Sequence, residues 1–218
     1  FGEFSSFSFY SSHQISSGEG GMITCRNPDD YEILKALRAH GWSRGLKNEK
    51  KISNKNKHLD SRFIFFNSGF NLRPTDISAS IGLSQFNDMK SFIFLRNKNR
   101  NFIVNSLKKS KIIKDNFYFI EANKNVKPSW FGIPIYIKNK KNRKKIIKNL
   151  EKRGIETRPI ISGNFIKQPS VKKYKLLKGS KFYNSDIVND RGFFIGLPTK
   201  KINNIFVNKI VKTFEQSI

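Results

Sequence analysis

The segment that decides the fold is FSSFSFYSSHQISSGEGGMIT, residues 4–24. Aromatic and serine side chains alternate from Phe7 to Tyr10, which is the two-residue period of a half-buried strand. A glycine cluster, Gly18 to Gly21, allows a sharp backbone turn before a second short apolar strand, Met22 to Cys25. We therefore expect two strands around a tight loop, and this loop presents the imidazole of His13 among several hydroxyls.

Two helices are expected after this segment. Asn27 reads as an N-cap, with Pro28 at the first helical position and acidic residues in the first turn, and the helix ends near Gly41. The polar, lysine-rich residues 42–60 read as a long mobile loop. A second helix begins at Pro74-Thr75-Asp76, and apolar residues at helical spacing extend it, straight or bent, to about Lys108.

The rest of the chain alternates strands and helices. Strands are expected at 117–122, 130–137, 156–161 and 192–196. A basic helix is expected over 140–153, with Ile146, Ile147 and Leu150 inward and Gly154 as its C-cap. A closing amphipathic helix covers 202–214. The alternation predicts an α/β fold class.

Composition limits the classes of function. No run of about 18 apolar residues is present, so no membrane span is expected. The first residues alternate instead of forming an apolar block, so no signal peptide is expected. Cys25 is the single cysteine, which excludes an internal disulfide and a four-cysteine cluster within one chain, and the location is expected to be cytoplasmic. The net charge of +26 would suit a nucleic-acid partner, but the lysines are spread along the chain without a recognised nucleic-acid motif.

Several motifs carry a resemblance, in order, over nearly the whole chain. They are Ser8-Phe9-Tyr10-x-x-His13, Gly18-Glu19-Gly20-Gly21, residues 37–42, residues 69–76, residues 154–158, Gly163-Asn164 with Gln168-Pro169, and residues 191–198. The sequence resembles the DegT/DnrJ/EryC1/StrS aminotransferase family, the sugar-modifying branch of the fold-type I vitamin B6 enzymes. The resemblance implies the C-terminal half of a longer enzyme. Residues 1–96 would end the large cofactor-binding domain, and residues 97–218 would form the small α+β domain.

His13 stands where most members of this family carry the lysine that forms a Schiff base with pyridoxal phosphate. An imidazole cannot form that bond, but it can move protons near neutral pH. The position resembles that in the pyridoxamine-phosphate-dependent 3-dehydratases of deoxysugar biosynthesis. The resemblance therefore implies pyridoxal or pyridoxamine phosphate as cofactor, with His13 as general base. Taken alone, a single loop histidine would more often have no function.

The resemblance also implies other site residues. Ser8 matches a serine that binds the cofactor phosphate, and Asn71 matches an asparagine that reaches the phosphate in the neighbouring subunit, so a homodimer with a shared site is expected. Arg158 and Asn164 match positions that face the mouth of the active site, where an arginine can bind a substrate diphosphate. Each has a structural alternative: an outward strand residue for Ser8, turn chemistry for Asn71, and a solvated or salt-bridged arginine for Arg158. His40 and Trp42 are expected to pack at a helix end.

Two departures affect the expected loop. Gln14 stands where many dehydratases have a second histidine, and Ser11 stands where proline is common. Glu19 matches an acidic position to which we assign no role.

The function expected from these residues is 3-dehydration of a nucleotide-linked 4-keto-6-deoxyhexose, with glutamate as amine donor, in deoxysugar or lipopolysaccharide biosynthesis. The alternatives are a nucleotide-sugar aminotransferase, and an inactive fragment or polyanion-binding basic chain.

Overall fold

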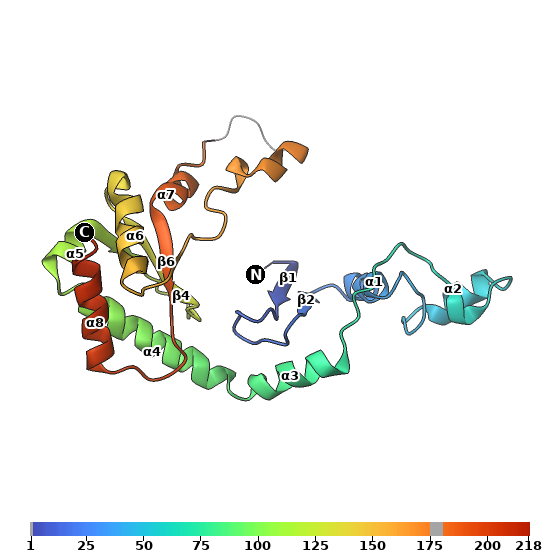
Figure 1. Cartoon of the computed structure of the whole chain (residues 1–218). Helices are drawn as coiled ribbons and strands as arrows, with labels where there is room; N and C mark the ends of the chain where they lie inside the picture. Colours follow the sequence, from blue (N-terminus) through green and yellow to red (C-terminus); the bar gives the residue numbers. More distant parts are fainter. Residues whose placement is uncertain (1, 175–180) are drawn as a thin grey trace. The chain divides into compact units, whose positions relative to one another are not determined.

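The computed structural model describes residues 2–174 and 181–218, and for Lys141 the backbone alone. These residues form two compact units, Phe1–Met89 and Lys90–Ile218, which we call the hairpin unit and the sheet unit (Figure 1). The prediction that the large and small domains of the family meet near Asn97 stays a prediction.

The hairpin unit begins with two antiparallel strands, β1 (Phe4–Ser8) and β2 (Gly21–Cys25), with Phe4 opposite Cys25 and Ser8 opposite Gly21. The predicted pair of strands around a loop is confirmed, although the first strand lies earlier than the alternation over 7–10 indicated. The reason is local: the carbonyl of Phe9 accepts a hydrogen bond from Ser17 N at 2.9 Å, so the chain already turns into the loop at Phe9.

Helix α1 (Pro28–Arg38) begins as predicted. The side chain of Asn27 accepts a hydrogen bond from Asp29 N at 2.8 Å, which satisfies one of the free amide donors of the first turn. The helix ends at Arg38, before His40 and Gly41, whose φ angles are 61° and 81°. Glycine adopts this left-handed backbone without a steric penalty, so the stop near Gly41 is confirmed.

The expectation that residues 42–60 form one long loop is wrong. Helix α2 (Glu49–Lys55) lies inside it, and a short 3-10 turn, η1 (Ser61–Phe63), follows. The carboxylate of Glu49 accepts a hydrogen bond from Gly45 N at 2.8 Å, and Leu46 is buried. The lysine content of the segment gave no sign of these two contacts, one made by an apolar side chain and the other by a carboxylate at the start of the helix.

The expected single helix from residue 74 to 108 is two helices. Thr75 caps α3 (Asp76–Phe86) by accepting a hydrogen bond from Ser78 N, and α4 (Met89–Leu107) follows. The break falls at Asn87 and Asp88, residue types whose short polar side chains compete with the helical backbone. Apolar spacing alone did not register this break, because both helices keep the same period.

The sheet unit contains a four-stranded antiparallel sheet in the order β3-β4-β6-β5. The strands are β3 (Phe117–Phe119), β4 (Gly132–Ile137), β5 (Thr157–Arg158) and β6 (Gly192–Gly196). All four were predicted, but β3, β4 and β5 are shorter than expected. β6 has the predicted bounds.

One face of this sheet forms the core. Ile133, Ile135 and Ile137 alternate inward along β4, as the two-residue period of a strand requires. They pack with buried residues of β3, β6, α4, α5 (Lys111–Asn116), α6 (Arg143–Lys152) and α8 (Asn204–Glu215). On the other face, Tyr118 and Tyr136 stack with ring centroids 4.7 Å apart.

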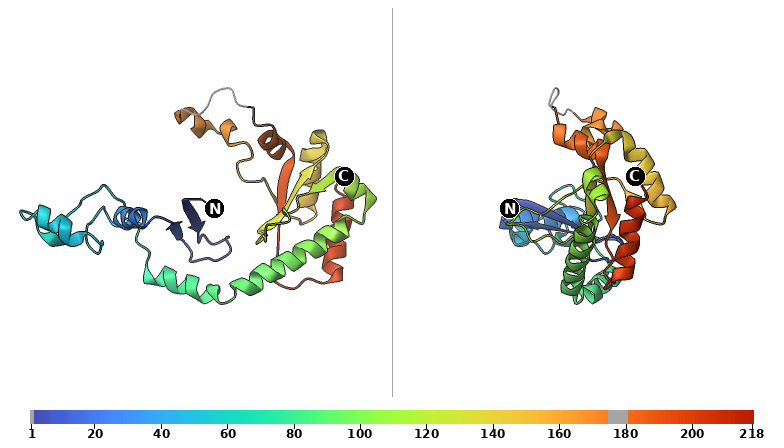
Figure 2. Two further views of the ribbon diagram at one scale, coloured as in Figure 1. Left: turned by 180° about the vertical axis from the view of Figure 1, so that it is seen from behind. Right: turned by 90° about the vertical axis from the view of Figure 1, so that its left-hand side faces the viewer.

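The predicted basic helix is α6, preceded by a 3-10 turn, η2 (Lys140–Asn142). Ile146 and Leu150 are fully buried, and Gly154 ends the helix with φ of 85°, so these expectations are confirmed. Helices α5 and α7 (Tyr183–Arg191) and the turns η3 (Phe165–Lys167) and η4 (Pro169–Lys173) were not predicted. Figure 2 shows the sheet unit from two further sides.

Candidate functional site

The loop between β1 and β2 presents His13 to solvent. Phe9 N donates to Gly20 O and Ser17 N donates to Phe9 O, both at 2.9 Å, so the base of the loop is closed by backbone hydrogen bonds. Inside it, His13 N donates to Tyr10 O at 2.9 Å, and the two rings meet edge to face with centroids 5.9 Å apart. The imidazole is therefore part of a loop that backbone hydrogen bonds close, and it is exposed.

Ser8 is the last residue of β1 and is exposed. Its hydroxyl oxygen accepts a hydrogen bond from Tyr10 N at 3.3 Å, which leaves the hydroxyl hydrogen as a donor for an acceptor outside the strand. Ser8 and His13 thus belong to the same hairpin end, one at the end of the strand and the other in the loop.

These two residues fit a phosphate-bearing cofactor that is held without a covalent bond. A hydroxyl donor suits a phosphate oxygen, and an imidazole can carry a proton but cannot form a Schiff base. The first lysine of the sequence is Lys35, and its ammonium binds the carboxylate of Glu32 at 3.2 Å and Gly45 O at 2.8 Å. The hairpin itself therefore offers no amine for a covalent link.

Asn71 lies on a different segment of the hairpin unit and is exposed. It forms an isolated antiparallel bridge with Ala39 at the end of α1. Gly41 and Gly69 make this approach possible: a Cβ on Gly69 would lie 2.1 Å from Gly41 N, and a Cβ on Gly41 would lie 1.7 Å from Asn67 O. The position of Asn71 is thus set by backbone contact with the end of α1.

The expectation that His40 and Trp42 pack at the end of α1 is confirmed. Their ring centroids lie 5.3 Å apart, and the indole also contacts Phe65 at 5.7 Å. The guanidinium of Arg73 lies 5.8 Å from the centre of the indole ring. These aromatic contacts give both residues a structural role.

Arg158 and Asn164 belong to the sheet unit and differ in exposure. Arg158, on β5, is exposed and pairs with Glu156 at 2.9 Å, so its guanidinium remains open to solvent and to ligands. Asn164 is buried: its amide donates to Asp186 Oδ1 at 2.9 Å, and its oxygen accepts from Ile166 N at 3.3 Å. The first bond reaches α7 and the second caps the turn η3, so Asn164 supports the local backbone.

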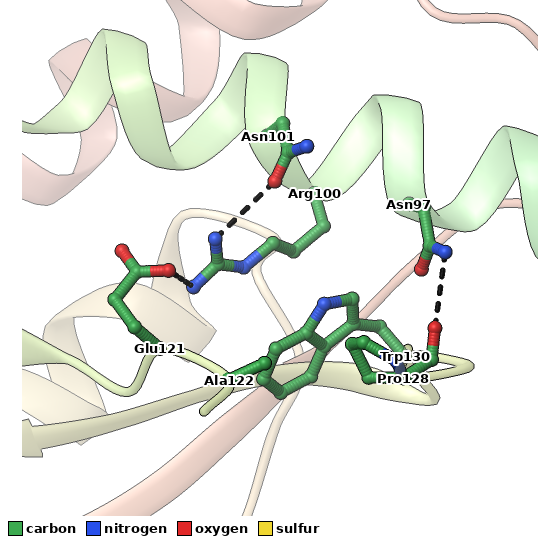
Figure 3. Close-up of a pocket in the computed structure, with 7 residues that line it drawn as sticks. All are labelled: Asn97, Arg100, Asn101, Glu121, Ala122, Pro128 and Trp130. Atoms are coloured by element: carbon green, nitrogen blue, oxygen red, sulfur yellow. Dashed lines mark hydrogen bonds and ion pairs between the residues drawn. The ribbon is translucent and has the colours of Figure 1, made fainter. Parts of the chain in front are cut away.

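A polar hollow of about 250 Å³ in the sheet unit was not expected from the sequence (Figure 3). Arg100 is buried and lies with its guanidinium 4.8 Å from the centre of the Trp130 ring. The guanidinium pairs with Glu121 at 2.6 Å and donates to Ile120 O, also at 2.6 Å. The lining residues come from separate segments around 97–101 and 121–130, and no local motif links them.

Charge pairing in this hollow is internal. Burial opposes ionisation of Glu121, but hydrogen bonds from Lys108 and Arg100 outweigh it, and the pKa of Glu121 lies below its ordinary value. The arginine charge is therefore matched by a carboxylate of the same unit, which ties α4 to the chain that follows β3.

The His, Cys, Asp and Glu side chains of the described residues form no group of three that could hold a metal ion. None of the helices that these residues form combines the length and the apolar character that a membrane crossing requires.

Comparison with known proteins agrees with this fold. Residues 1–214 match the DegT/DnrJ/EryC1/StrS aminotransferase family. GDP-4-keto-6-deoxy-D-mannose 3-dehydratase of Escherichia coli O55:H7 is 33% identical over 201 residues, 90% of this chain and 50% of that protein. The enzyme of the same name from Yersinia pseudotuberculosis is 30% identical over 216 residues, 94% of this chain and 53% of that protein.

A solved structure, E. coli GDP-4-keto-6-deoxy-D-mannose-3-dehydratase with bound hydrated PLP, superposes with a TM-score of 0.85 at 29% identity. The match covers 98% of this chain and 55% of that one. The fold is therefore that of a PLP-dependent aminotransferase-type enzyme, as the sequence predicted. The chain belongs to the DegT/DnrJ/EryC1/StrS aminotransferase family, and it spans about half the length of the relatives it matches.

Proposed function

We propose that this chain carries the histidine-bearing half of a pyridoxamine-phosphate-dependent sugar 3-dehydratase. The substrate would be a nucleotide-linked 4-keto-6-deoxyhexose, with GDP-4-keto-6-deoxymannose as the first candidate because two relatives are named for it. The observation that carries the proposal is the exposed imidazole of His13, on a hairpin whose sequence supplies no lysine before Lys35.

The cofactor, when bound, supplies an amine and a conjugated ring that accepts electrons. This chain supplies proton transfer and binding. An imidazole nitrogen of His13 accepts a proton at the reacting centre, and as imidazolium it can return one. The hydroxyl of Ser8 donates a hydrogen bond to the cofactor phosphate. The exposed guanidinium of Arg158 binds the substrate diphosphate, for which it must exchange or share its contact with Glu156.

The test of this reaction uses a full-length protein that contains this chain, incubated with GDP-4-keto-6-deoxymannose, pyridoxal phosphate and glutamate. We expect loss of the 3-hydroxyl, seen by mass spectrometry and proton NMR. His13→Asn should lower the rate about 10²–10⁴-fold, as removal of a general base does. His58→Asn, at another exposed histidine, is the matched control. A stable 4-amino sugar as the sole product would refute the dehydratase assignment.

The cofactor role of Ser8 has its own matched pair. Ser8→Ala should weaken cofactor binding, measured by absorbance titration, because a phosphate oxygen loses its hydroxyl donor. Ser6→Ala removes a hydroxyl on the same face of β1, two residues earlier, and should leave cofactor binding unchanged. Equal cofactor affinity in the two variants would remove Ser8 from the phosphate site.

The shared homodimer site predicts complementation. Homodimers of His13→Asn and of Asn71→Ala should each be nearly inactive. If Asn71 completes the site of the neighbouring subunit, random mixing gives about half heterodimers, each with one intact site, and restores about a quarter of the activity. If the mixed sample stays inactive although subunit exchange is demonstrated, Asn71 does not act in the neighbouring site.

The second candidate is an aminotransferase that works without a covalent lysine, which the family name itself favours. His13→Lys separates the two: a gain of 4-amination is expected if residue 13 occupies the place of the family lysine. The third candidate, a polyanion-binding basic chain, has its support in the net charge of +26. It predicts heparin binding that disappears with salt and does not depend on His13.

A further inference from the structure

A hydrogen bond joins the loop that carries His13 to α3. Ser16 N donates a hydrogen bond to the side-chain oxygen Oε1 of Gln85 at 3.0 Å, across 69 positions of sequence. Gln85 is half-buried, whereas most side chains of α3 are exposed. This bond joins the loop to a helix of the same unit, and Ser16 lies only three residues from His13.

The contact continues at Ser17, which is 7% exposed on a hairpin that is otherwise largely open to solvent. Its hydroxyl donates to Glu19 O at 2.8 Å. On α3, Gly82 lies one turn before Gln85, and a Cβ added to Gly82 would lie 3.5 Å from the Cβ of Ser17. Positions three apart share one face of a helix, so Gly82 and Gln85 form one contact surface for Ser16 and Ser17.

Two glycines give the loop the backbone shape that brings Ser16 and Ser17 to this surface. Gly20 has φ of 156°, and a Cβ there would lie 2.6 Å from the hydroxyl of Ser17. Gly18, with φ of 81°, donates through its amide to the hydroxyl of Ser16 at 3.2 Å. Backbone hydrogen bonds join Phe9 to Ser17 and Gly20, and the bond from Ser16 N to Gln85 adds a contact with α3 beside this closure.

We infer that Gln85 is a positioning residue for His13: it holds the Ser16–Ser17 corner against α3 and thereby sets where the imidazole stands. The inference rests on the proposed function. An exposed loop that is fixed only where its two ends meet moves on the nanosecond to microsecond scale. A general base that is displaced by 1 Å can cost about 100-fold in rate. The contact of Ser16 and Ser17 with α3, close in sequence to His13, reduces that motion.

The test uses three variants of a full-length protein that contains this chain. Gln85→Met keeps the length of the side chain and removes the acceptor, whereas Gln85→Glu keeps an oxygen acceptor. Ser84→Ala, at the neighbouring position, removes a hydroxyl that bonds only Ile81 O within its own helix, and serves as control. Rates are normalised to the fraction of protein that carries cofactor, so that loss of folded protein is not counted.

We expect Gln85→Met to lower kcat for dehydration about 10–100-fold, with KM for the sugar changed less than about threefold. Gln85→Glu should restore most of the rate, and Ser84→Ala should match the parent. Hydrogen exchange in a peptide covering residues 9–20 should accelerate in Gln85→Met alone.

Unchanged exchange and unchanged kcat in Gln85→Met would overturn the inference, and so would failure of Gln85→Glu to differ from Gln85→Met. The proposed function fails separately, if His13→Asn leaves dehydration intact. Hydrogen exchange still decides whether Gln85 holds the loop in that event, because it does not depend on activity.

Discussion

The two units of the molecule differ in how much apolar surface they bury. The sheet unit buries a continuous apolar core between its sheet and helices α4, α5, α6 and α8, with Ile135, Leu150 and Phe193 fully inaccessible. The hairpin unit carries His13 and Ser8, yet large apolar side chains such as Phe70, Leu72 and Leu83 are more than 60% exposed. The proposed general base and the proposed phosphate-binding hydroxyl therefore lie on the unit with little core of its own, whereas the well-packed unit carries Arg158, the proposed substrate-binding residue.

The difference shows what holds each unit together. In the sheet unit, burial of apolar surface dominates, at roughly 25 cal/mol for each Å². In the hairpin unit, specific hydrogen bonds, caps and glycine turns place the residues, and each contributes only about 0.5–1.5 kcal/mol. Stability should thus be far more sensitive to apolar truncation in the sheet unit than in the hairpin unit.

The largest expected effect is in separate expression of the units. Residues 90–218 should unfold cooperatively on heating, followed by circular dichroism, because their core is complete within the unit. Residues 1–89 should show no cooperative transition, because too little apolar surface is buried to offset chain entropy. A sharp transition from residues 1–89 would contradict the comparison.

Point substitutions give the next largest contrast. Phe193→Ala should reduce the free energy of unfolding by about 3–5 kcal/mol, because it empties a fully buried site. Phe86→Ala removes the same ring from a position that is 56% exposed, and should change it by less than about 0.5 kcal/mol. Urea denaturation of the two variants measures both values, and equal losses would show that the hairpin unit has a comparable core.

Two glycines with nearly the same backbone angle sharpen the comparison further. Gly154→Ala, at φ of 85° with open space around it, should cost about 1–2 kcal/mol through strain alone. Gly41→Ala, at φ of 81°, adds overlap with Asn67 O and should displace the segment around Asn71. Hydrogen exchange of residues 39–71 should increase in Gly41→Ala, and a cost no larger than that of Gly154→Ala would count against tight backbone packing there.

The smallest effects are expected from surface ion pairs, one in each unit. Hydrogen bonds from Arg62 lower the pKa of Asp60 to about 2, and hydrogen bonds from Lys140 and Asn189 lower the pKa of Asp190 to about 2. A carboxylate whose pKa is lowered by folding stabilises the folded state when the pH is above the ordinary pKa near 4. This contribution is lost as the pH falls toward 2.

NMR titration of the side-chain carboxyl carbons measures these values. Lys140→Gln should raise the pKa of Asp190 toward its ordinary value and leave Asp60 unchanged, while Arg62→Gln should do the reverse. Asp60 is exposed and Asp190 is partly exposed, so the accompanying change in stability should be slight. An unshifted Asp190 in Lys140→Gln would show that the ion pair does not persist in solution.

Local signals predicted the parts of the fold that depend on neighbours in sequence. The cap at Asn27, the turn at Gly154 and the inward face of α6 followed from residue type and spacing. The break at Asn87-Asp88 did not follow, because the spacing of apolar residues does not show a break between two helices of the same period. The helix inside residues 42–60 did not follow either, because a high lysine content hides the effect of one buried apolar residue, Leu46. Helices α5 and α7 are too short to show a clear period.

The candidate site divides in the same way. His13 was identified because one short motif holds it, and the structure places it on the expected loop. The environment of Asn164 could not be predicted, because its partners Asp186 and Asn189 lie 22 and 25 positions away. The hollow around Arg100 was missed for a similar reason, since helix α4 meets the chain near Glu121 and Trp130 only after folding.

The sequence by itself indicated the family through motifs spread along the chain, and it determined the hairpin and the position of His13 through one contiguous segment, residues 4–24. Tertiary structure decided which polar side chains are hydrogen-bonded within the fold and which remain exposed to a ligand. It buried Asn164, left Arg158 exposed, and brought Gln85 to the loop of His13. The physical reason is that hydrogen bonds and burial act through space, and chain positions that share no local pattern become neighbours only when each unit folds.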